Sequence, residues 1–266
     1  MAAMPVRKLR LWQDKIETEI AILGDGPPLL YLHGAFGLRH DQDFLELMAQ
    51  THTVYAPKFP GTSGNDPDAV HQIDDWWDLI IYYGELLDRL ALKHTVLVGH
   101  SFGGMLGCEI AAAMPERVSK LVLIDPVGLY RDDKPVKNWM VLSPTELRAA
   151  LFANPKSAHA EKFFAVPVDD ASRIDAKVDF VWSQACTGKF IWPIPDKGLK
   201  KHIHRIAMPT LLIWGKADGI IAPAYADEFA KRIAHSHVTT LDGAGHLPHF
   251  EQAAKVAALV GEFLRD

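Results

Sequence analysis

Apolar and polar residues alternate along this chain with two different spacings. Short continuous apolar runs, typical of strands buried on both faces of a sheet, occur at 29–34, 52–57, 95–99, 120–125, 209–215 and 237–241. Longer stretches with apolar residues three or four positions apart, typical of amphipathic helices, occur at 41–50, 73–92, 102–114, 224–233 and 251–264. Two alternating runs predict a first pair of strands at 7–12 and 16–22. Strands that alternate with helices predict an α/β protein, with a mostly parallel twisted sheet flanked by helices.

One long segment, 128–207, interrupts this alternation and contains no clear strand. Within it, Ser143 as N-cap, Pro144 at the first helical position and Glu146 two residues later predict a helix that begins with a capping box. We therefore predict a core formed by 1–127 and 208–266, and a helical cap formed by the inserted segment.

Composition and charge narrow the class of protein. With 266 residues, 48% hydrophobic and 23% charged, the chain is expected to form a globular fold. A net charge of −5 without a basic block disfavours nucleic acid as a partner. We also find no signal-peptide pattern and no apolar stretch of the roughly 20 residues that cross a membrane. Two cysteines, Cys108 and Cys186, do not suit a disulfide scaffold, so we expect a cytoplasmic protein. A homodimer is compatible with the sequence.

The stretch "TVLVGHSFGGMLG" at 95–107 places a serine between a strand and a helix. Ser101 has Gly99 and Gly103 two positions away on either side, which fits the G-x-S-x-G nucleophile elbow. In such a turn the serine backbone is strained, and side chains two residues away would collide. A serine that merely caps a helix would explain the hydroxyl but not the glycines. We therefore predict that Ser101 is a nucleophile.

A serine hydroxyl needs a base to accept its proton. His246 lies in the glycine-rich loop "LDGAGHLPHFEQ" between the last strand and the last helix, at the same sheet edge as Ser101. We favour His246, with His249 as the alternative, whereas His33 and His100 flank glycine turns and are expected to be structural. The histidine pairs at 202/204 and 235/237 lack nearby carboxylates or cysteines, so no metal is expected, nor any other cofactor.

The histidine in turn needs an acid that fixes its tautomer. Three aspartates compete for this role. Asp218 follows a strand in "WGKADGIIAP", Asp125 ends another strand, and Asp242 precedes the turn that carries His246. We rank Asp218 first, because the order serine, aspartate, histidine is the one expected of this kind of fold.

Two backbone N–H groups should complete the site as an oxyanion hole. The N–H of Phe102, the residue after the serine, is one. The loop in "YLHGAFG" at 31–37 should provide the other, with Ala35 as our choice and Phe36 as the alternative.

With "HGAFG", "GHSFGG", "GKADGIIAP" and "GAGHLPHFEQ" in this order, the chain resembles the α/β-hydrolase-fold superfamily over 29–126 and 208–264. The resemblance implies Ser101 as nucleophile, Asp218 as acid and His246 as base, and it matches the inserted segment to the family's helical cap. One departure is Lys58 in "KFPGTSGN", where many relatives carry aspartate before a PG-x-G-x-S run.

A serine hydrolase that cleaves a small neutral ester with an apolar or aromatic group is the leading functional hypothesis. A carbon–carbon bond hydrolase of ring-cleavage dienones resembles the same layout, and the fold also serves as a non-enzymatic small-molecule receptor. The cap is rich in aromatic residues and carries no clustered arginines. The side chains expected to line a substrate pocket are those of Phe36, Trp139, Trp182 and Trp192.

Overall fold

The structure is a computed structural model that describes residues 4–62, 66–192 and 196–265. Eight strands form one sheet in the order β1-β2-β4-β3-β5-β6-β7-β8. The pairs β1–β2 and β2–β4 are antiparallel and the other neighbours are parallel. The strands are β1 (Val6–Leu11), β2 (Ile16–Leu23), β3 (Pro28–Leu32), β4 (Thr53–Pro57), β5 (Thr95–His100), β6 (Val118–Ile124), β7 (Thr210–Gly215) and β8 (Ser236–Leu241).

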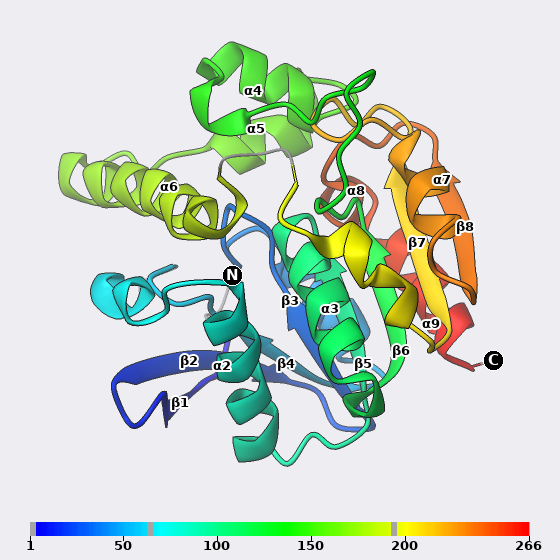
Figure 1. The fold of residues 1–266 in the computed structure, drawn as a ribbon. Coiled ribbons are helices and arrows are strands. Elements are labelled where there is room, and N and C mark those ends of the chain that lie inside the picture. Colours follow the sequence, from blue (N-terminus) through cyan, green and yellow to red (C-terminus); the bar gives the residue numbers. More distant parts are fainter. Residues whose placement is uncertain (1–3, 63–65, 193–195, 266) are drawn as a thin grey trace.

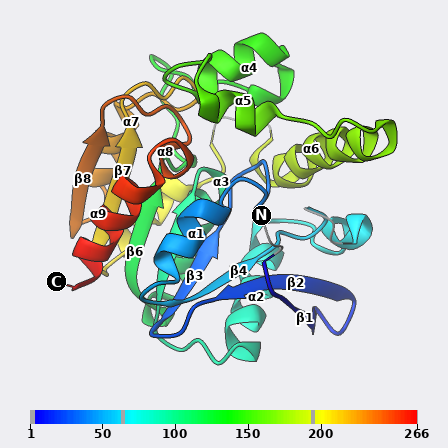
Figure 2. The same ribbon diagram turned by 180° about the vertical axis from the view of Figure 1, so that it is seen from behind.

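Helices cover both faces of the sheet, as predicted (Figure 1). On one face lie α2 (Trp76–Arg89), α3 (Phe102–Ala113) and α7 (Tyr225–Ala230). The opposite face, seen in Figure 2, is covered by α1 (Gln42–Met48) and α9 (Ala253–Arg265). A buried apolar cluster fills the space between the sheet and each of these layers. The central strands are buried on both sides, which explains their unbroken apolar sequence.

The inserted segment lies over the carboxyl ends of the strands (Figure 1). It contains the short 3-10 helix η3 (Trp139–Val141) and the helices α4 (Pro144–Leu151), α5 (Ala158–Phe164) and α6 (Asp170–Ile191). Its described residues contain no strand. The helix α4 begins with the predicted capping box, in which Ser143 and Glu146 exchange hydrogen bonds.

The beginning and the end of the inserted segment are in contact where the segment joins the core. A Cβ added to Gly128 would lie 2.7 Å from Cδ2 of Leu199, so these two residues are in contact. After this point two 3-10 helices, η4 (Leu199–Lys201) and η5 (Ile203–Arg205), pack along α3. The side chain of Arg205 donates to the Ala112 carbonyl, and His202 pairs with Glu109. The last residues of the predicted cap therefore pack on the core.

Element ends differ from the sequence prediction where side-chain caps intervene. The predicted helix at 73–92 is shorter, because the Asp75 side chain accepts hydrogen bonds from the N–H groups of Trp77 and Asp78 and begins α2 there. The 3-10 helix η1 (Pro67–Gln72) lies between the predicted strand at 52–57 and the predicted helix at 73–92, where no helix was predicted. The last predicted helix is divided at Gln252 into α8 (Pro248–Glu251) and α9. Among the described helices, none has both the length and the apolar character needed to span a bilayer.

Candidate active site

Ser101 occupies a strained turn between β5 and α3. Its φ of 51° and ψ of −112° lie outside the regions that non-glycine residues ordinarily adopt. A Cβ on Gly99 would lie 2.4 Å from the Gly103 carbonyl oxygen, and one on Gly103 would lie 2.0 Å from the Leu32 carbonyl oxygen. Both distances are far below van der Waals contact, so the elbow closes only with glycine at these positions. The turn has the geometry expected of a nucleophile elbow.

His246 links the Ser101 hydroxyl to Asp218. Its Nε2 is 2.9 Å from Ser101 Oγ, and its Nδ1 is 2.8 Å from Asp218 Oδ2. An ionised carboxylate only accepts, so Nδ1–H donates to Asp218, and Nε2 is left as the acceptor that faces the serine. All three side chains are buried. They come from the ends of β5, β7 and β8, which meet at one edge of the sheet because these strands are parallel.

The histidines near the elbow have separate partners. His100 Nε2 donates to the His246 carbonyl oxygen at 2.8 Å and so holds the backbone of that loop. His249, the alternative base, donates from Nε2 to Asp41 Oδ1 at 3.1 Å. His33 accepts the Phe59 N–H at Nε2 and donates from Nδ1 to the Gly34 carbonyl. Burial lowers the pKa of His100 and of His33, which keeps both rings neutral.

The three aspartates considered for the acid have different environments. Asp218 accepts three hydrogen bonds, from Ile220 N–H and Ile221 N–H at Oδ1 and from the His246 ring at Oδ2. Asp125 is fully buried and accepts from the Gly215 N–H. Asp242 is exposed and pairs with Lys216. Of these three aspartates, Asp218 is the one that is hydrogen-bonded to His246.

The predicted oxyanion donors belong to the loop after β3 and to the start of α3. The loop after β3 packs directly on the elbow, since a Cβ on Gly34 would be 3.4 Å from Ser101 Cβ. Ala35 follows in this loop, and Phe102 is the first residue of α3. Within the described part of the chain, neither of their N–H groups donates a hydrogen bond to another residue. Two free N–H groups beside a serine suit an anion that forms there.

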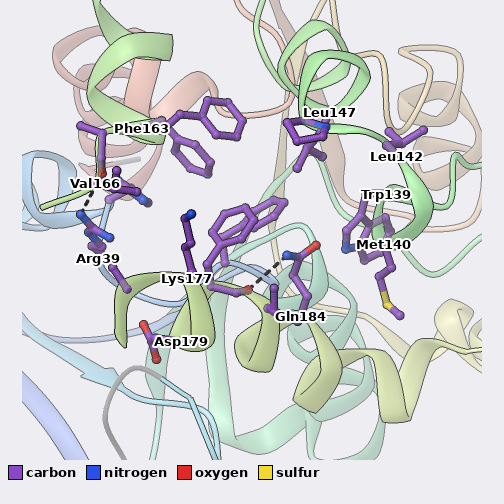
Figure 3. A pocket seen from close by; sticks show the side chains of 18 residues that line it. Arg39, Trp139, Met140, Leu142, Leu147, Phe163, Val166, Lys177, Asp179 and Gln184 are labelled. Atoms are coloured by element: carbon purple, nitrogen blue, oxygen red, sulfur yellow. Dashed lines mark hydrogen bonds between the residues drawn. The ribbon is translucent and has the colours of Figure 1, made fainter. Parts of the chain in front are cut away.

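A cavity of about 420 Å³ lies between the cap helices and the loop after β3 (Figure 3). Its apolar lining includes two of the predicted residues, Phe36 and Trp139. Trp139 and Met140 lie across the cavity from Arg39 and Val166 in Figure 3. The other apolar and aromatic residues that line it include Leu142, Leu147, Phe163, Phe164 and Phe180. Ser101 itself is not in the lining, and Phe36 is the lining residue that directly follows Ala35 in the loop beside the elbow.

Trp182 and Trp192, which the sequence also predicts for a substrate pocket, are not among the residues that line this cavity. Phe180 faces the cavity, and a residue two positions along a helix points to nearly the opposite side. The Trp182 ring accordingly turns toward His71, with ring centroids 6.2 Å apart. Trp192 follows the end of α6 and is 49% exposed.

Several cavity residues were not predicted from the sequence. His40 stacks on Phe163 with ring centroids 4.1 Å apart, and Phe36 stacks on Phe180 at 5.3 Å. Arg39 donates to the Ala165 carbonyl at the rim (Figure 3). These residues sit in a loop and on helix faces that carry no motif. The aromatic enrichment of the cap was the one signal that could have indicated them.

The loop after β4 carries the departure from the family pattern. Lys58 forms an ion pair with Glu19 of β2 at 2.6 Å, so its side chain is directed toward the antiparallel edge of the sheet. Ser63, the serine that would replace Ser101 if Ser101 were not the nucleophile, lies outside the described residues.

Comparison with known proteins agrees with this fold. A family model described as "Alpha/beta hydrolase family" matches residues 29–259. The chain therefore belongs to the alpha/beta hydrolase family, and the predicted superfamily and fold are confirmed.

Similar members carry different activities in their names. The chain is 28% identical to 2-hydroxymuconate semialdehyde hydrolase of Pseudomonas sp. (strain CF600), over 94% of this chain and 91% of the relative. It is 30% identical to human monoacylglycerol lipase ABHD6, over 91% and 76%. Among solved structures, the serine hydrolase CCSP0084 from the polyaromatic hydrocarbon-degrading bacterium Cycloclasticus zankles superposes with a TM-score of 0.77 at 19% identity, over 99% of this chain and 98% of that one.

Proposed function

We propose that this protein is a serine hydrolase that cleaves a small neutral ester with an apolar or aromatic acyl group. The observation that carries the proposal is the continuous chain of hydrogen bonds from Ser101 through His246 to Asp218, with two free N–H groups beside the serine. The triad is recognised by this geometry and by the roles that it permits.

The chemistry follows from the positions of the atoms. Ser101 Oγ attacks the ester carbonyl carbon while His246 Nε2 takes the hydroxyl proton. The N–H groups of Ala35 and Phe102 stabilise the negative charge that develops on the carbonyl oxygen. The bond to the alcohol then breaks, and the alcohol leaves with the proton from His246. Water attacks the acyl-enzyme, again losing a proton to His246, and releases the acid and the free serine. Asp218 supports the imidazolium at each step.

The cavity supports a neutral apolar substrate group. Its lining is mainly aromatic and aliphatic, although it also includes the partly buried Asp179 and the buried Gln184. The side chains of Arg39 and Lys177, which also line it, are exposed. An unpaired charge buried in such an interior would lose hydration without a compensating partner. Each additional buried methylene should improve binding by up to about 0.8 kcal/mol until the cavity is full. Phe36 lines the cavity and directly follows Ala35, whose N–H is a proposed oxyanion donor, so its ring would orient the carbonyl toward Ser101.

A carbon–carbon bond hydrolase is the second candidate. It is supported by the 28% identity with 2-hydroxymuconate semialdehyde hydrolase over almost the whole chain. A ring-cleavage dienone and a nitrophenyl ester distinguish the two functions, because turnover removes the colour of the first and releases coloured nitrophenol from the second.

Labelling with a fluorophosphonate probe tests the nucleophile. We expect covalent labelling of the wild-type protein, no labelling of Ser101→Ala, and full labelling of Ser183→Ala. Ser183 is the matched control, since it is also a buried serine but lies on α6. Absence of labelling in the wild type would contradict an activated serine and favour a small-molecule receptor.

Substrate class is tested with nitrophenyl esters of increasing acyl length and one charged succinyl ester. We expect kcat/KM to rise with acyl length and then to fall, and the succinyl ester to be poor. A flat profile, or the highest value on the charged ester, would contradict a closed apolar acyl pocket.

A further inference from the structure

Asp125 is a buried acid that is not a member of the proposed triad. It directly follows β6, has no exposed surface, and has a φ of 43°, so its backbone is strained as that of Ser101 is. Its Oδ1 accepts the Gly215 N–H at 3.0 Å. Its Oδ2 is fully buried and has no hydrogen-bond donor among the described residues. An ionised carboxylate would be badly solvated in this position.

Asp125 lies against the acid of the triad. An oxygen of Asp125, an oxygen of Asp218 and a ring nitrogen of His246 all lie within 4.8 Å of one another. The other titratable groups around this cluster are Glu251 of α8, which accepts the N–H groups of Gly245 and Ala153, and the neutral His100 at the end of β5.

The two aspartates differ in the number of donors that stabilise a negative charge. Asp218 accepts three hydrogen bonds and Asp125 accepts one. Two carboxylates at this separation in a buried site do not both ionise, and the one with more donors keeps the charge. Burial first, and the charge of Asp218 second, raise the pKa of Asp125 well above its usual range. Asp125 is therefore the neutral partner, and a protonated Oδ2 changes from an orphaned acceptor into a donor.

We propose that Asp125 is a positioning residue of the triad, a neutral carboxylic acid whose O–H donates to the Asp218 carboxylate. The inference rests on the proposed function, because it assigns Asp125 a role through Asp218. The proton of Asp125 stays on Asp125 while His246 exchanges protons with Ser101 and the leaving group. The added hydrogen bond fixes the Asp218 side chain and spreads its negative charge, which limits how strongly Asp218 holds a proton on His246.

Two substitutions separate this role from the alternatives. Asn at position 125 keeps an acceptor for the Gly215 N–H and a donor for Asp218, whereas Leu has a similar shape and neither group. For Asp125→Asn we expect kcat within about threefold of wild type and an unchanged pH profile, since the hydrogen bonds are retained. For Asp125→Leu we expect kcat to fall about tenfold with little change in KM. The midpoint of the acidic limb of kcat/KM should also rise by about one pH unit, because the charge of Asp218 is no longer shared.

The direction in which the acidic limb of the pH profile moves distinguishes the proposal from two alternatives. If Asp125 were ionised, Asp125→Asn would remove a negative charge and the acidic limb would move to lower pH. If Asp125 were only structural, Asp125→Leu would lower the melting temperature without moving the limb. Either outcome overturns the proposal.

Infrared spectroscopy provides a second measurement, which needs neither the Leu variant nor activity. At neutral pH we expect the C=O band of a protonated carboxylic acid in the wild-type protein and in Ser101→Ala, and its loss in Asp125→Asn. Absence of the band in the wild type would overturn the proposal while leaving the proposed hydrolase function intact. The band could also be present in a wild-type protein that the fluorophosphonate does not label. That result would overturn the hydrolase function and the positioning role of Asp125, but Asp125 would still be protonated.

Discussion

At the scale of single residues, the hydrogen-bond partner of each histidine near the elbow determines what that ring can do. His246 has a carboxylate on one side and the serine hydroxyl on the other, so it can hold and release a proton. His100 uses a ring nitrogen to hold the His246 backbone, and His249 is occupied by Asp41. Three imidazoles within one cluster therefore have three different roles, and only one of them faces the nucleophile.

Loss of the Asp218 charge should disable the base. In Asp218→Asn the amide no longer fixes the His246 tautomer or supports the imidazolium, so we expect kcat to fall by about 10⁴-fold. Steady-state kinetics on a nitrophenyl ester would measure this. Asp242→Asn is the control, since Asp242 belongs to the same sheet edge but is exposed and pairs with Lys216. A larger loss in Asp125→Asn than in Asp218→Asn would assign the acid to Asp125.

Much of the site could be predicted at this scale because its residues are tied to turns with distinctive local chemistry. The glycines around Ser101 and the loop of His246 mark such turns in the sequence. The choice between Asp218 and Asp125 was harder, because both follow strands that end at the same edge. The hydrogen-bond donors that distinguish them are backbone N–H groups, which no sequence pattern displays.

At the scale of elements, the elbow depends on how closely α3 approaches the sheet. In Gly103→Ala the new methyl group would lie 2.0 Å from the Leu32 carbonyl oxygen, and this backbone atom cannot move out of the way as a side-chain end could. We expect a destabilisation of at least about 1–3 kcal/mol in urea unfolding, together with loss of activity.

Gly261→Ala is the matched control for this helix substitution. Gly261 lies inside α9, where an added Cβ would meet nothing closer than Arg265 at 3.8 Å. There we expect a gain of roughly 0.5–1 kcal/mol from the higher helix propensity of alanine. If the two substitutions had similar effects, the close packing of α3 would not be the cause.

Substitution of two tryptophans of the cap tests whether the cavity binds the substrate. Trp139 lines it, whereas Trp192 lies beyond the end of α6. In Trp139→Ala we expect KM for the best aromatic or medium-chain ester to rise about tenfold or more, because a large contact surface is lost. In Trp192→Ala we expect no significant change. Equal effects of both substitutions on KM would contradict the cavity as the acyl site.

The elements themselves were predictable to different degrees. The buried strands were found because their apolar runs reflect burial on both faces, as in Leu121 to Ile124 of β6. The face of α6 that lines the cavity was not found, because apolar residues lie on both sides of this helix. Ile174 and Val178 are exposed, and Phe190 packs against Phe59 and Trp76 of the core.

At the scale of the whole molecule, buried neutral histidines make stability depend on pH. Burial lowers the pKa of His40 to about 4, and it lowers the pKa of His33 and of His100 as well. In the unfolded chain histidine titrates near pH 6.5. Below this pH the unfolded state therefore binds protons that the folded state does not, and stability is lost as pH falls from about 6.5 toward about 4.

Thermal melts across this pH range would measure the loss. We expect the melting temperature to fall on acidification, and to fall less steeply in His40→Phe, which keeps a ring stacked on Phe163 but removes the titrating group. His237→Gln, at an exposed position on β8, is the histidine control and should follow the wild-type curve. A melting temperature that stays constant or rises between about pH 6.5 and pH 4 would contradict this origin of acid sensitivity.

The contact between Gly128 and Leu199 has a consequence for how such proteins diverge. The inserted segment leaves and re-enters the core at one point. It is therefore an insertion with adjacent ends, and the pairing of β6 with β7 does not fix its length or its sequence. Doubling the length of such an insertion adds only about 0.6 kcal/mol of closure entropy. The segment still contacts the catalytic edge at one place, because the Leu151 carbonyl accepts the His246 N–H at 2.8 Å and the Ala150 carbonyl accepts the Gly219 N–H at 3.0 Å. We therefore expect sequence and length to vary most in the parts of the segment that lie away from these two contacts.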